Sequence, residues 1–497
     1  MKSTNIAPQL DRDDRAALIR RVRPQDWCNP PPREIYDLVV VGAGPAGIEA
    51  AQYARRLGLT IALVERNQLG GNSLNAGSIP SKTLIHSARL CAQIRDAAEF
   101  AVSSPTELKL DFAALKARMM RVRARIAEYH AVDRLLHDGV EIFFGEAQFS
   151  GPSKVTLDAI SLHFKKAIVA TGARPNPSNF PGLDDVGYRT STNIFDMPEL
   201  PQRLVVIGGG PLGCELAQAF CRLGSRVTVI QNDPKFLPRE ERDAAELLSE
   251  SMARDGVSIM LNTTVTGAHA EAGSKFVDGQ NYDTKVSVPA DEILLSIGRL
   301  PNVENLGLAQ ADVDCDDKGL KVDDLLQTTN QNIYGAGDVC MSHKFTNVAW
   351  VTARMAVRNA FQPNKLPHSQ MMIPWCTYCE PEIAHVGMQV WEAREKSIPV
   401  KTYTVMMQDV DRAITDGQDD GFVKIHVQDG TDKILGATIV ATRASELINE
   451  VSVVMRAGIG MHGLSRIIHA YPAQSEAIRL AALAYEDDQL RHTDAAI

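Results

Sequence analysis

The sequence predicts an α/β protein with two Rossmann-like domains, followed by a C-terminal α+β domain. Residues 36–65 and residues 204–231 each read as a β-strand, a glycine-rich turn, a helix and a second strand. After residue 370 the pattern changes to short alternating strands with two late helices. A chain of 497 residues is also too long for a single hydrophobic core and suggests about three domains.

The first 33 residues predict a polar N-terminal arm. A short charged helix is expected at 11–22, and three consecutive prolines at 30–32 exclude regular structure. We expect a mobile arm on the protein surface. This segment has acidic residues and no apolar stretch of the kind that signal peptides carry, so we expect a cytoplasmic protein.

The first repeat begins with the apolar run 36–41, which predicts a buried parallel strand. A helix at 48–57 and a strand at 61–64 follow, and Glu65 ends that strand. The turn between the first strand and the helix consists of Gly42, Gly44, Pro45, Ala46 and Gly47 together with Ala43. Its first glycine allows the tight turn, its second lets the backbone approach a pyrophosphate, and its third lets the helix pack on the strand. The helix N-terminus favours the phosphates, and Glu65 can accept hydrogen bonds from a ribose diol.

The second repeat has the same spacing. Its turn contains Gly208, Gly210 and Gly213, and Gln231 ends its second strand, 23 positions after Gly208 as Glu65 is after Gly42. Gln231 is neither the carboxylate that would favour NADH nor the arginine that would favour NADPH. Nearby, Asp233 disfavours a 2′-phosphate, whereas Lys235 and Arg239 could attract one. We therefore leave the nucleotide open, with use of both slightly favoured.

Capping residues and hydrophobic patterns also predict helices and strands in the rest of the chain. Asp111 is a plausible N-cap of a helical region that runs through Leu136. In the C-terminal domain we expect strands at 421–426 and 434–440 and helices near 443–457 and 474–486. The net charge of −9 disfavours nucleic acid as a partner, and no apolar run is as long as a membrane span.

At this point the chain resembles the pyridine nucleotide–disulfide oxidoreductases, from Tyr36 to about Tyr485. The resemblance depends on motifs in a fixed order. Besides the two glycine turns they are residues 70–82, Ala170 to Gly172, Glu215, residues 298–302, residues 335–338 and residues 381–384. Residues 26–30 and 344–349 are most similar to a mercuric-reductase-like subgroup of that family.

The resemblance implies FAD in the first nucleotide site and NADH or NADPH in the second, with no metal. It implies domains at 34–182 and 303–368 for FAD, 183–302 for NAD(P) and 369–497 for pairing into a homodimer. For FAD it implies contacts from Glu65, Gly71, Asn72, Ser73, Lys82, Ala170, Thr171, Gly172, Gly337 and Asp338. For the nicotinamide nucleotide it implies contacts from the second turn, Gln231, Gly298 and Arg299. It also implies an ion pair between Lys82 and Glu215 beside flavin N5, where a cation stabilises the anionic reduced ring.

One departure from the family lies at its redox centre. The two cysteine positions of the family are occupied by Ser73 and Ser78, and serine cannot form a reversible disulfide. Cys91 is roughly 20 Å from Ser78 along a helix, too far to substitute. Two closer pairs, Cys214 with Cys221 and Cys376 with Cys379, are each roughly 10 Å apart, the latter facing opposite sides of a strand. Cys28, on the arm, is left open.

A second departure lies near the C-terminus. The acid–base histidine of the family is replaced by Tyr471, while Glu476 is retained. Tyrosine titrates near pH 10 and is a poor base at neutral pH, so hydrogen bonding and simple packing are equally favoured for Tyr471. The tail from residue 485 contains no cysteine, which disfavours mercuric reduction.

These observations favour an NAD(P)H:acceptor oxidoreductase that passes electrons from reduced flavin directly to a small-molecule acceptor such as a quinone. Ser73 and Ser78 would either bond to the flavin or acceptor or only fill space. Two alternatives stay open. One is a soluble transhydrogenase between NADH and NADPH, and the other is a flavin-based binding protein that responds to redox state with little turnover.

Overall fold

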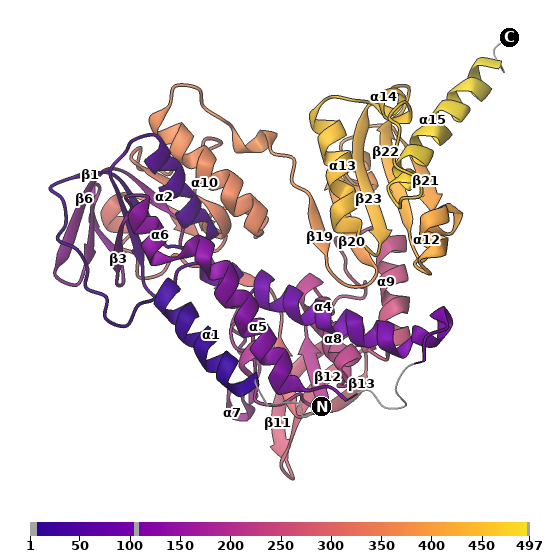
Figure 1. Ribbon diagram of the computed structural model, residues 1–497, viewed down its shortest axis with the longest axis horizontal. Coiled ribbons are helices and arrows are strands. Elements are labelled where there is room, and N and C mark those ends of the chain that lie inside the picture. Colours follow the sequence, from indigo (N-terminus) through magenta and orange to yellow (C-terminus); the bar gives the residue numbers. More distant parts are fainter. Residues whose placement is uncertain (1–6, 104–108, 495–497) are drawn as a thin grey trace.

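A computed structural model describes residues 7–103 and 109–494 of the chain. Figure 1 shows three bodies: a sheet domain at the left, a second domain below it, and a C-terminal domain at the upper right. We call them the first nucleotide domain, the second nucleotide domain and the C-terminal domain. The predicted class, two Rossmann-like domains and an α+β domain, is confirmed.

The first nucleotide domain is built on a seven-stranded sheet. The strand order is β3-β2-β1-β6-β5-β4, and β18 pairs with β6. The strands are β1 Tyr36–Val41, β2 Ile61–Glu65, β3 Glu141–Phe144, β4 Gln148–Gly151, β5 Lys154–Leu157, β6 Ile160–Val169 and β18 Ile333–Gly335. Strands β3, β2, β1, β6 and β18 run parallel and are largely buried, as their continuous apolar runs predict. Because β18 comes from far along the chain, the second nucleotide domain is an insertion in the first.

Two helices bring distant sequence to the first glycine turn. Helix α2 (Pro45–Arg56) follows the turn directly, and α10 (Thr346–Phe361) packs against it. Both lie together at the upper part of the first domain in Figure 1. This packing places residues 337–349 beside the turn. The other helices of this part are α1 Ala7–Val22, α3 Gly71–Asn75, α4 Ser78–Arg95, α5 Phe112–Ile126 and α6 Val132–His137.

The helical region predicted from Asp111 through Leu136 is interrupted. The Asp111 side chain does cap α5, accepting from the Ala114 N–H at 2.8 Å. However, α5 ends at Ile126, and Ala131 is extended before α6 begins. After this break, Val132 and Leu135 of α6 are buried in the hydrophobic core. Tertiary burial here overrides the helical pattern.

The N-terminal arm is packed, and our expectation of a mobile surface arm was wrong for its described part. Helix α1 lies along α5, and the two helices cross the front of Figure 1 side by side. Leu18 and Val22 are 3% and 0% exposed and join the core of the first domain. The Arg21 guanidinium donates to the Ala124 carbonyl at 2.8 Å. Helix α1 has a narrow apolar face that includes Leu18 and Val22, and its many charged residues obscured this face in the sequence.

The second nucleotide domain contains a parallel sheet of order β10-β9-β8-β14 and an antiparallel sheet of order β11-β12-β13. Its strands are β8 Arg203–Ile207, β9 Arg226–Ile230, β10 Ser258–Met260, β11 Thr263–Glu271, β12 Ser274–Asn281, β13 Thr284–Ala290 and β14 Glu292–Leu295; its helices are α7 Leu183–Val186, α8 Pro211–Leu223 and α9 Arg242–Asp255. The two chain crossings between the nucleotide domains pair as β7 (Ala173–Pro175) and β15 (Arg299–Pro301). The crossings therefore form a two-stranded antiparallel ribbon between the nucleotide domains.

The C-terminal domain is an antiparallel sheet of order β19-β20-β23-β22-β21 with helices on it. Its elements are β19 Trp375–Thr377, β20 Glu382–Gly387, α11 Val390–Glu395, β21 Val400–Met406, α12 Asp411–Thr415, β22 Phe422–Gln428, β23 Ile434–Ala441, α13 Ala444–Arg456, α14 Met461–Ser465 and α15 Glu476–Asp494; the short β16 Cys315–Asp316 and β17 Gly319–Leu320 precede the domain. The strands predicted at 421–426 and 434–440 and the helices predicted near 443–457 and 474–486 are confirmed. Across the described ranges, no helix is both long enough and apolar enough to cross a bilayer.

Candidate functional site

In the first glycine turn, the space beside the second glycine, Gly44, is open to a ligand. Gly42 has φ +100°, and a Cβ there would meet the Ala170 carbonyl oxygen at 2.5 Å. At Gly47 a Cβ would lie 1.7 Å from the Gly42 oxygen. At Gly44, by contrast, the nearest atom to a Cβ is the Gly71 Cα at 3.8 Å. The outer glycines are thus required by the fold, whereas Gly44 leaves room for the close approach of a phosphate.

Glu65 is buried behind this turn. One of its carboxylate oxygens accepts from the Ala43 N–H at 2.7 Å, and the other accepts from the Asn67 N–H at 2.8 Å. Burial raises the pKa of Glu65, and the two N–H donors act against this shift. The carboxylate is therefore fixed at the end of β2, where a ribose diol could donate to its remaining lone pairs.

Asp338 approaches the same turn from the other end of the chain. A Cβ at Gly337 would lie 3.2 Å from the Ala46 Cβ, which shows how closely these segments meet. Arg299 pairs with Asp338 at 3.2 Å and donates to the Ala173 carbonyl at 2.6 Å, while its Nε is buried without a hydrogen-bond partner. Burial raises the pKa of Asp338, opposed by Arg299 and Lys344. An orphaned donor beside a buried acid fits a bound group rich in hydroxyl and phosphate oxygens.

Residues 170–172 are held in place by a residue that the sequence analysis named only within a motif. Asn302 donates to the Thr171 carbonyl at 2.8 Å, and the Thr171 hydroxyl donates to the Asn302 carbonyl at 2.7 Å. The Asn302 N–H also donates to Gly172 at 2.9 Å. These three hydrogen bonds join the two chain crossings, and they hold the segment whose Ala170 lies close to Gly42.

The second glycine turn has the same design. A Cβ at Gly213 would lie 2.1 Å from the Gly208 oxygen, but nothing lies within 4 Å of one at Gly210. The Gln231 side chain accepts from the Gly209 N–H at 2.8 Å, as Glu65 does from Ala43. Gln231 thus supports its own turn without a charge. The open position at Gly210 fits a second pyrophosphate.

Lys82 and Glu215 form an ion pair between α4 and α8. The Lys82 Nζ is 2.7 Å from a Glu215 carboxylate oxygen, and the two side chains are 35% and 4% exposed. Tyr378 completes the pair: its N–H donates to the other Glu215 oxygen at 3.0 Å, and Lys82 lies 4.4 Å above its ring. Sequence reasoning missed Tyr378, since only its place after β19 brings it here. The predicted pair is present, while its place beside a flavin stays a prediction.

Ser73 and Ser78 belong to different helices. Ser73 lies within α3, and the Thr346 hydroxyl at the start of α10 donates to its oxygen at 3.3 Å. Ser78 is the first residue of α4, on the same helix as Lys82. Asn72 precedes Ser73 on α3, which begins at Gly71. Two hydroxyls therefore occupy these positions at the start of α4 and within α3.

The cysteines are all unpaired thiols. Burial raises the pKa of Cys91, Cys214, Cys221, Cys340, Cys376 and Cys379. Cys379 lies beyond β19, not on a strand as expected, and it packs in a different core cluster from Cys376. Cys28 and Cys315 are exposed. Buried, neutral thiols are poor nucleophiles.

Tyr471 and Glu476 do not join the Lys82 group within one chain. The Tyr471 hydroxyl donates to Asp411 at 2.6 Å, and that carboxylate raises the pKa of Tyr471. Glu476 begins α15 and accepts from Arg479 at 2.9 Å. Tyr471 is 71% exposed on the C-terminal domain. Any role at the site would therefore require a second chain.

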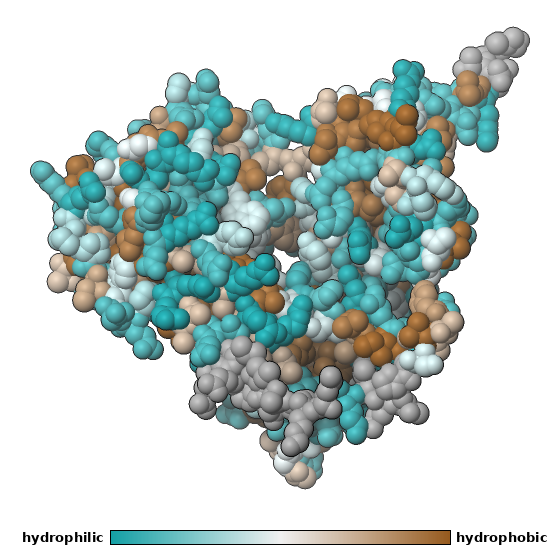
Figure 2. Space-filling model, viewed as in Figure 1, coloured by the Kyte–Doolittle hydropathy of each residue, from teal (hydrophilic) through white to brown (hydrophobic). Residues whose placement is uncertain are grey.

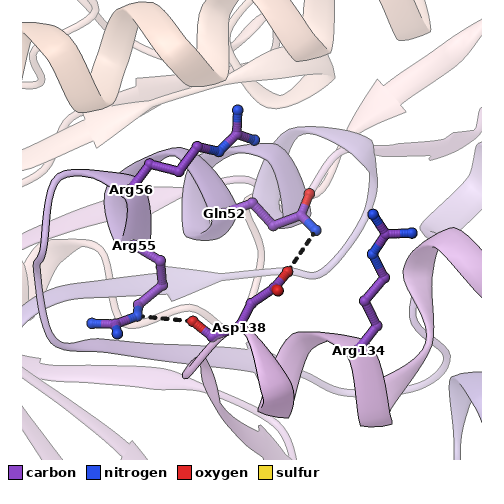
Figure 3. A pocket seen from close by; sticks show the side chains of 5 residues that line it. All are labelled: Gln52, Arg55, Arg56, Arg134 and Asp138. Carbon is purple, nitrogen blue, oxygen red and sulfur yellow. Dashed lines mark hydrogen bonds between the residues drawn. The ribbon is translucent and has the colours of Figure 1, made fainter.

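A surface cavity of about 340 Å³ lies away from the glycine turns (Figure 3). It is lined by the far end of α2 and by α6, with Arg55 bonded to the Asp138 carbonyl and Gln52 to its carboxylate. Residues 52–56 are on the order of 12–18 Å along the helix from Gly44. We interpret these hydrogen bonds as structural contacts that join α2 to the end of α6. No group of three or more His, Cys, Asp or Glu residues able to hold a metal ion occurs in the part of the chain that the structure describes.

Comparisons with known proteins agree with this geometry. Residues 36–361 match the family described as pyridine nucleotide-disulphide oxidoreductase, and residues 373–482 match its dimerisation domain. A dihydrolipoyl dehydrogenase of Thermus scotoductus is 33% identical over 90% of this chain and 96% of that protein. A mercuric reductase of Staphylococcus aureus is 30% identical over 91% of this chain and 83% of that protein.

Two solved structures extend the comparison to the fold. LpdA from Mycobacterium tuberculosis has a TM-score of 0.83 and 27% identity, covering 90% of this chain and 99% of that chain. The copper(II) complex of the HOCl-induced flavoprotein disulfide reductase RclA from Escherichia coli has a TM-score of 0.81 and 26% identity, covering 91% of this chain and 100% of that chain.

Proposed function

This chain belongs to the pyridine nucleotide-disulphide oxidoreductase family, and we propose that it is a member that works without a redox disulfide. The family binds FAD and uses NAD(P)H, and both glycine turns of this chain fit such nucleotides. The observation that carries the proposal is the pair Ser73 and Ser78 at the positions of the family cysteines. In the proposed reaction, NAD(P)H, a proton and a quinone give NAD(P)⁺ and a hydroquinone.

FAD, when bound, would supply a ring that takes a hydride from the nicotinamide and later gives two electrons to the acceptor. The residues of this chain would orient the partners and balance charge. Gly44 and Gly210 admit the pyrophosphates, and Glu65 would accept from a ribose. Lys82, held by Glu215, would place a positive charge where negative charge develops during reduction.

Ser73 and Ser78 would face the acceptor side. The Ser73 oxygen already accepts from Thr346, so its own hydroxyl hydrogen is available to an acceptor carbonyl. A hydroxyl can orient a carbonyl but cannot carry electrons. The acceptor must then contact the isoalloxazine itself, which suits a planar molecule such as a quinone.

The other thiols do not offer a replacement relay. Six of them have pKa values raised by burial, which keeps them protonated at neutral pH.

Transhydrogenation between NADH and NADPH is the second candidate. Gln231 favours it, because an uncharged side chain that bonds to Gly209 neither repels nor binds a 2′-phosphate. The third candidate, a redox-responsive binding protein, was favoured only by the N-terminal arm. Since the arm packs on its own first domain, that support is lost.

We propose a homodimer formed through the C-terminal domain. Figure 2 shows hydrophobic side chains gathered over α13 and α14 at the outer end of this domain. They surround a cavity of about 480 Å³ lined by Val453, Ile459, Ile467 and Ile468, the last of which is 95% exposed. A second copy would cover this surface and bring its Tyr471 toward the site.

The test is an anaerobic reductive titration of the purified yellow protein, followed by stopped-flow assays with quinones. We expect two electrons per subunit, no thiolate-to-flavin charge-transfer band, and quinone reduction that survives alkylation of the thiols. A Ser73→Cys/Ser78→Cys variant is the positive control for additional electron uptake. Uptake of four electrons by the natural protein would contradict the proposal, and faster reduction of thio-NADP⁺ than of any quinone would select transhydrogenation.

A further inference from the structure

The N-terminal arm precedes the family match, which begins at residue 36. It nevertheless packs against residues 65–71, the segment that joins Glu65 to the start of α3. This segment is part of the first nucleotide site. The arm therefore lies outside the matched residues but contacts a site within them.

The arm holds the segment through its backbone. The Leu69 N–H donates to the Val22 carbonyl at 3.0 Å. The Arg23 guanidinium donates to the carbonyls of Asn67 at 3.0 Å and Arg66 at 3.4 Å. Backbone groups of three residues of the segment, Arg66, Asn67 and Leu69, are thus bonded to the arm.

A second set of contacts anchors the arm to β3. Arg23 lies 4.3 Å over the Phe144 ring, and Trp27 meets that ring edge-on at 5.5 Å. The Asn29 amide donates to the Phe144 carbonyl at 2.9 Å and accepts from its N–H at 2.8 Å. Phe144 pairs with Glu65 in the sheet, so the anchor lies next to the residue that would receive the ribose.

The braced segment shapes the site directly. Its Asn67 N–H fixes one oxygen of Glu65, and its Gly70 N–H donates to the Ala43 carbonyl at 2.9 Å. A Cβ at Gly71 would lie 2.7 Å from the Gly44 Cα, so Gly71 is the wall of the open position at Gly44. A shift of this segment would move the ribose acceptor and the pyrophosphate position together.

We propose that residues 13–29 form a brace that holds residues 65–71 in the conformation that binds FAD, with Arg23 and Asn29 as its positioning residues. The inference rests on FAD occupying the first glycine turn, and not on the identity of the electron acceptor. The brace raises the affinity for FAD by preorganising the site, because binding then no longer has to order the segment.

The test compares FAD affinity in matched variants. Apoprotein is titrated with FAD and followed by quenching of flavin fluorescence, while circular dichroism reports its thermal unfolding. In Arg23→Ala/Asn29→Ala the dissociation constant of FAD should rise about tenfold, as expected from losing several modest hydrogen bonds. The control is Arg33→Ala, on the same arm, since Arg33 bonds to Glu141 and not to the braced segment; it should change the constant by less than about twofold.

Rescue distinguishes positioning from general stability. Arg23→Lys keeps a donor for the Asn67 carbonyl and a cation over Phe144, so it should recover part of the affinity. If the double variant does not fold, Arg23→Ala and Asn29→Asp carry the test singly, each with a loss of about threefold.

An FAD dissociation constant in the folded variants equal to that of Arg33→Ala would overturn the inference. Because the titration needs no electron acceptor, a failure of the quinone assays would leave this result standing, and the reverse is also true.

Discussion

Replacing Glu215 by glutamine tests the centre of the proposed site. The substitution keeps the shape of the side chain and removes its charge. Its amide oxygen can still accept from the Tyr378 N–H, but its NH₂ group must then face the Lys82 Nζ, now 2.7 Å from an oxygen. Two donors cannot bond to each other, so Lys82 should turn toward solvent.

The structure sets the size of this effect. A hydrogen bond between charged groups contributes about 1.5–3 kcal/mol. Lys82 is 35% exposed, so water replaces part of what is lost, and the lower end of that range applies. About 1.5 kcal/mol corresponds to a reduction of bound flavin by NAD(P)H that is roughly tenfold slower, with a similar loss in the free energy of unfolding.

The assay is anaerobic stopped-flow reduction of the holoenzyme over a range of nucleotide concentrations, beside urea unfolding. We expect the limiting rate to fall and the dissociation constant of the nucleotide to change little. The control is Glu250→Gln, an exposed glutamate on α9. If Glu215→Gln reduces its flavin as fast as this control does, Lys82 and Glu215 do not act as proposed.

Three other substitutions test separate parts of the structure. Gly210→Ala should leave the fold intact but raise the KM for NAD(P)H about tenfold, whereas Gly47→Ala, with its Cβ 1.7 Å from a backbone oxygen, should yield no folded protein by circular dichroism. Tyr378→Leu should slow flavin reduction by a few fold in stopped-flow, because it removes the ring under Lys82, and Tyr378→Phe should not. Burial raises the pKa of Glu240 from 4.5 to about 7, so stability present below pH 4.5 is lost as pH rises through 7. Glu240→Gln should abolish this loss, on the order of 3 kcal/mol, in urea unfolding measured on both sides of that window.

Much of the fold could be read from local pattern. The strands at 36–41, 61–65, 203–207 and 226–230 follow from continuous β-branched and aliphatic runs, and the glycine spacing after them identifies the turns. The reason is that a strand–turn–helix unit is specified by neighbours within a few residues, so one sequence contains its whole signal.

Local sequence patterns gave a wrong prediction where a segment's structure depends on packing against residues far away in the sequence. The arm was expected to be mobile, because the buried Leu18 and Val22 are few among many charges and their partners lie on α5. The helical region expected from Asp111 through Leu136 is divided into α5 and α6, with an extended Ala131 before α6. Val132 and Leu135 of α6 are buried in the core of the first domain, against residues distant in sequence.

The sequence by itself determined the residue chemistry: two glycine-rich turns, serines at positions 73 and 78, and an oppositely charged pair, Lys82 and Glu215, 133 positions apart. Only the tertiary structure decided which groups meet, placing Tyr378 under Lys82, Arg299 beside Asp338 and Thr346 against Ser73. The physical reason is that covalent order sets which atoms are available, whereas hydrogen bonds and ion pairs act over a few ångströms and depend on how separate elements pack.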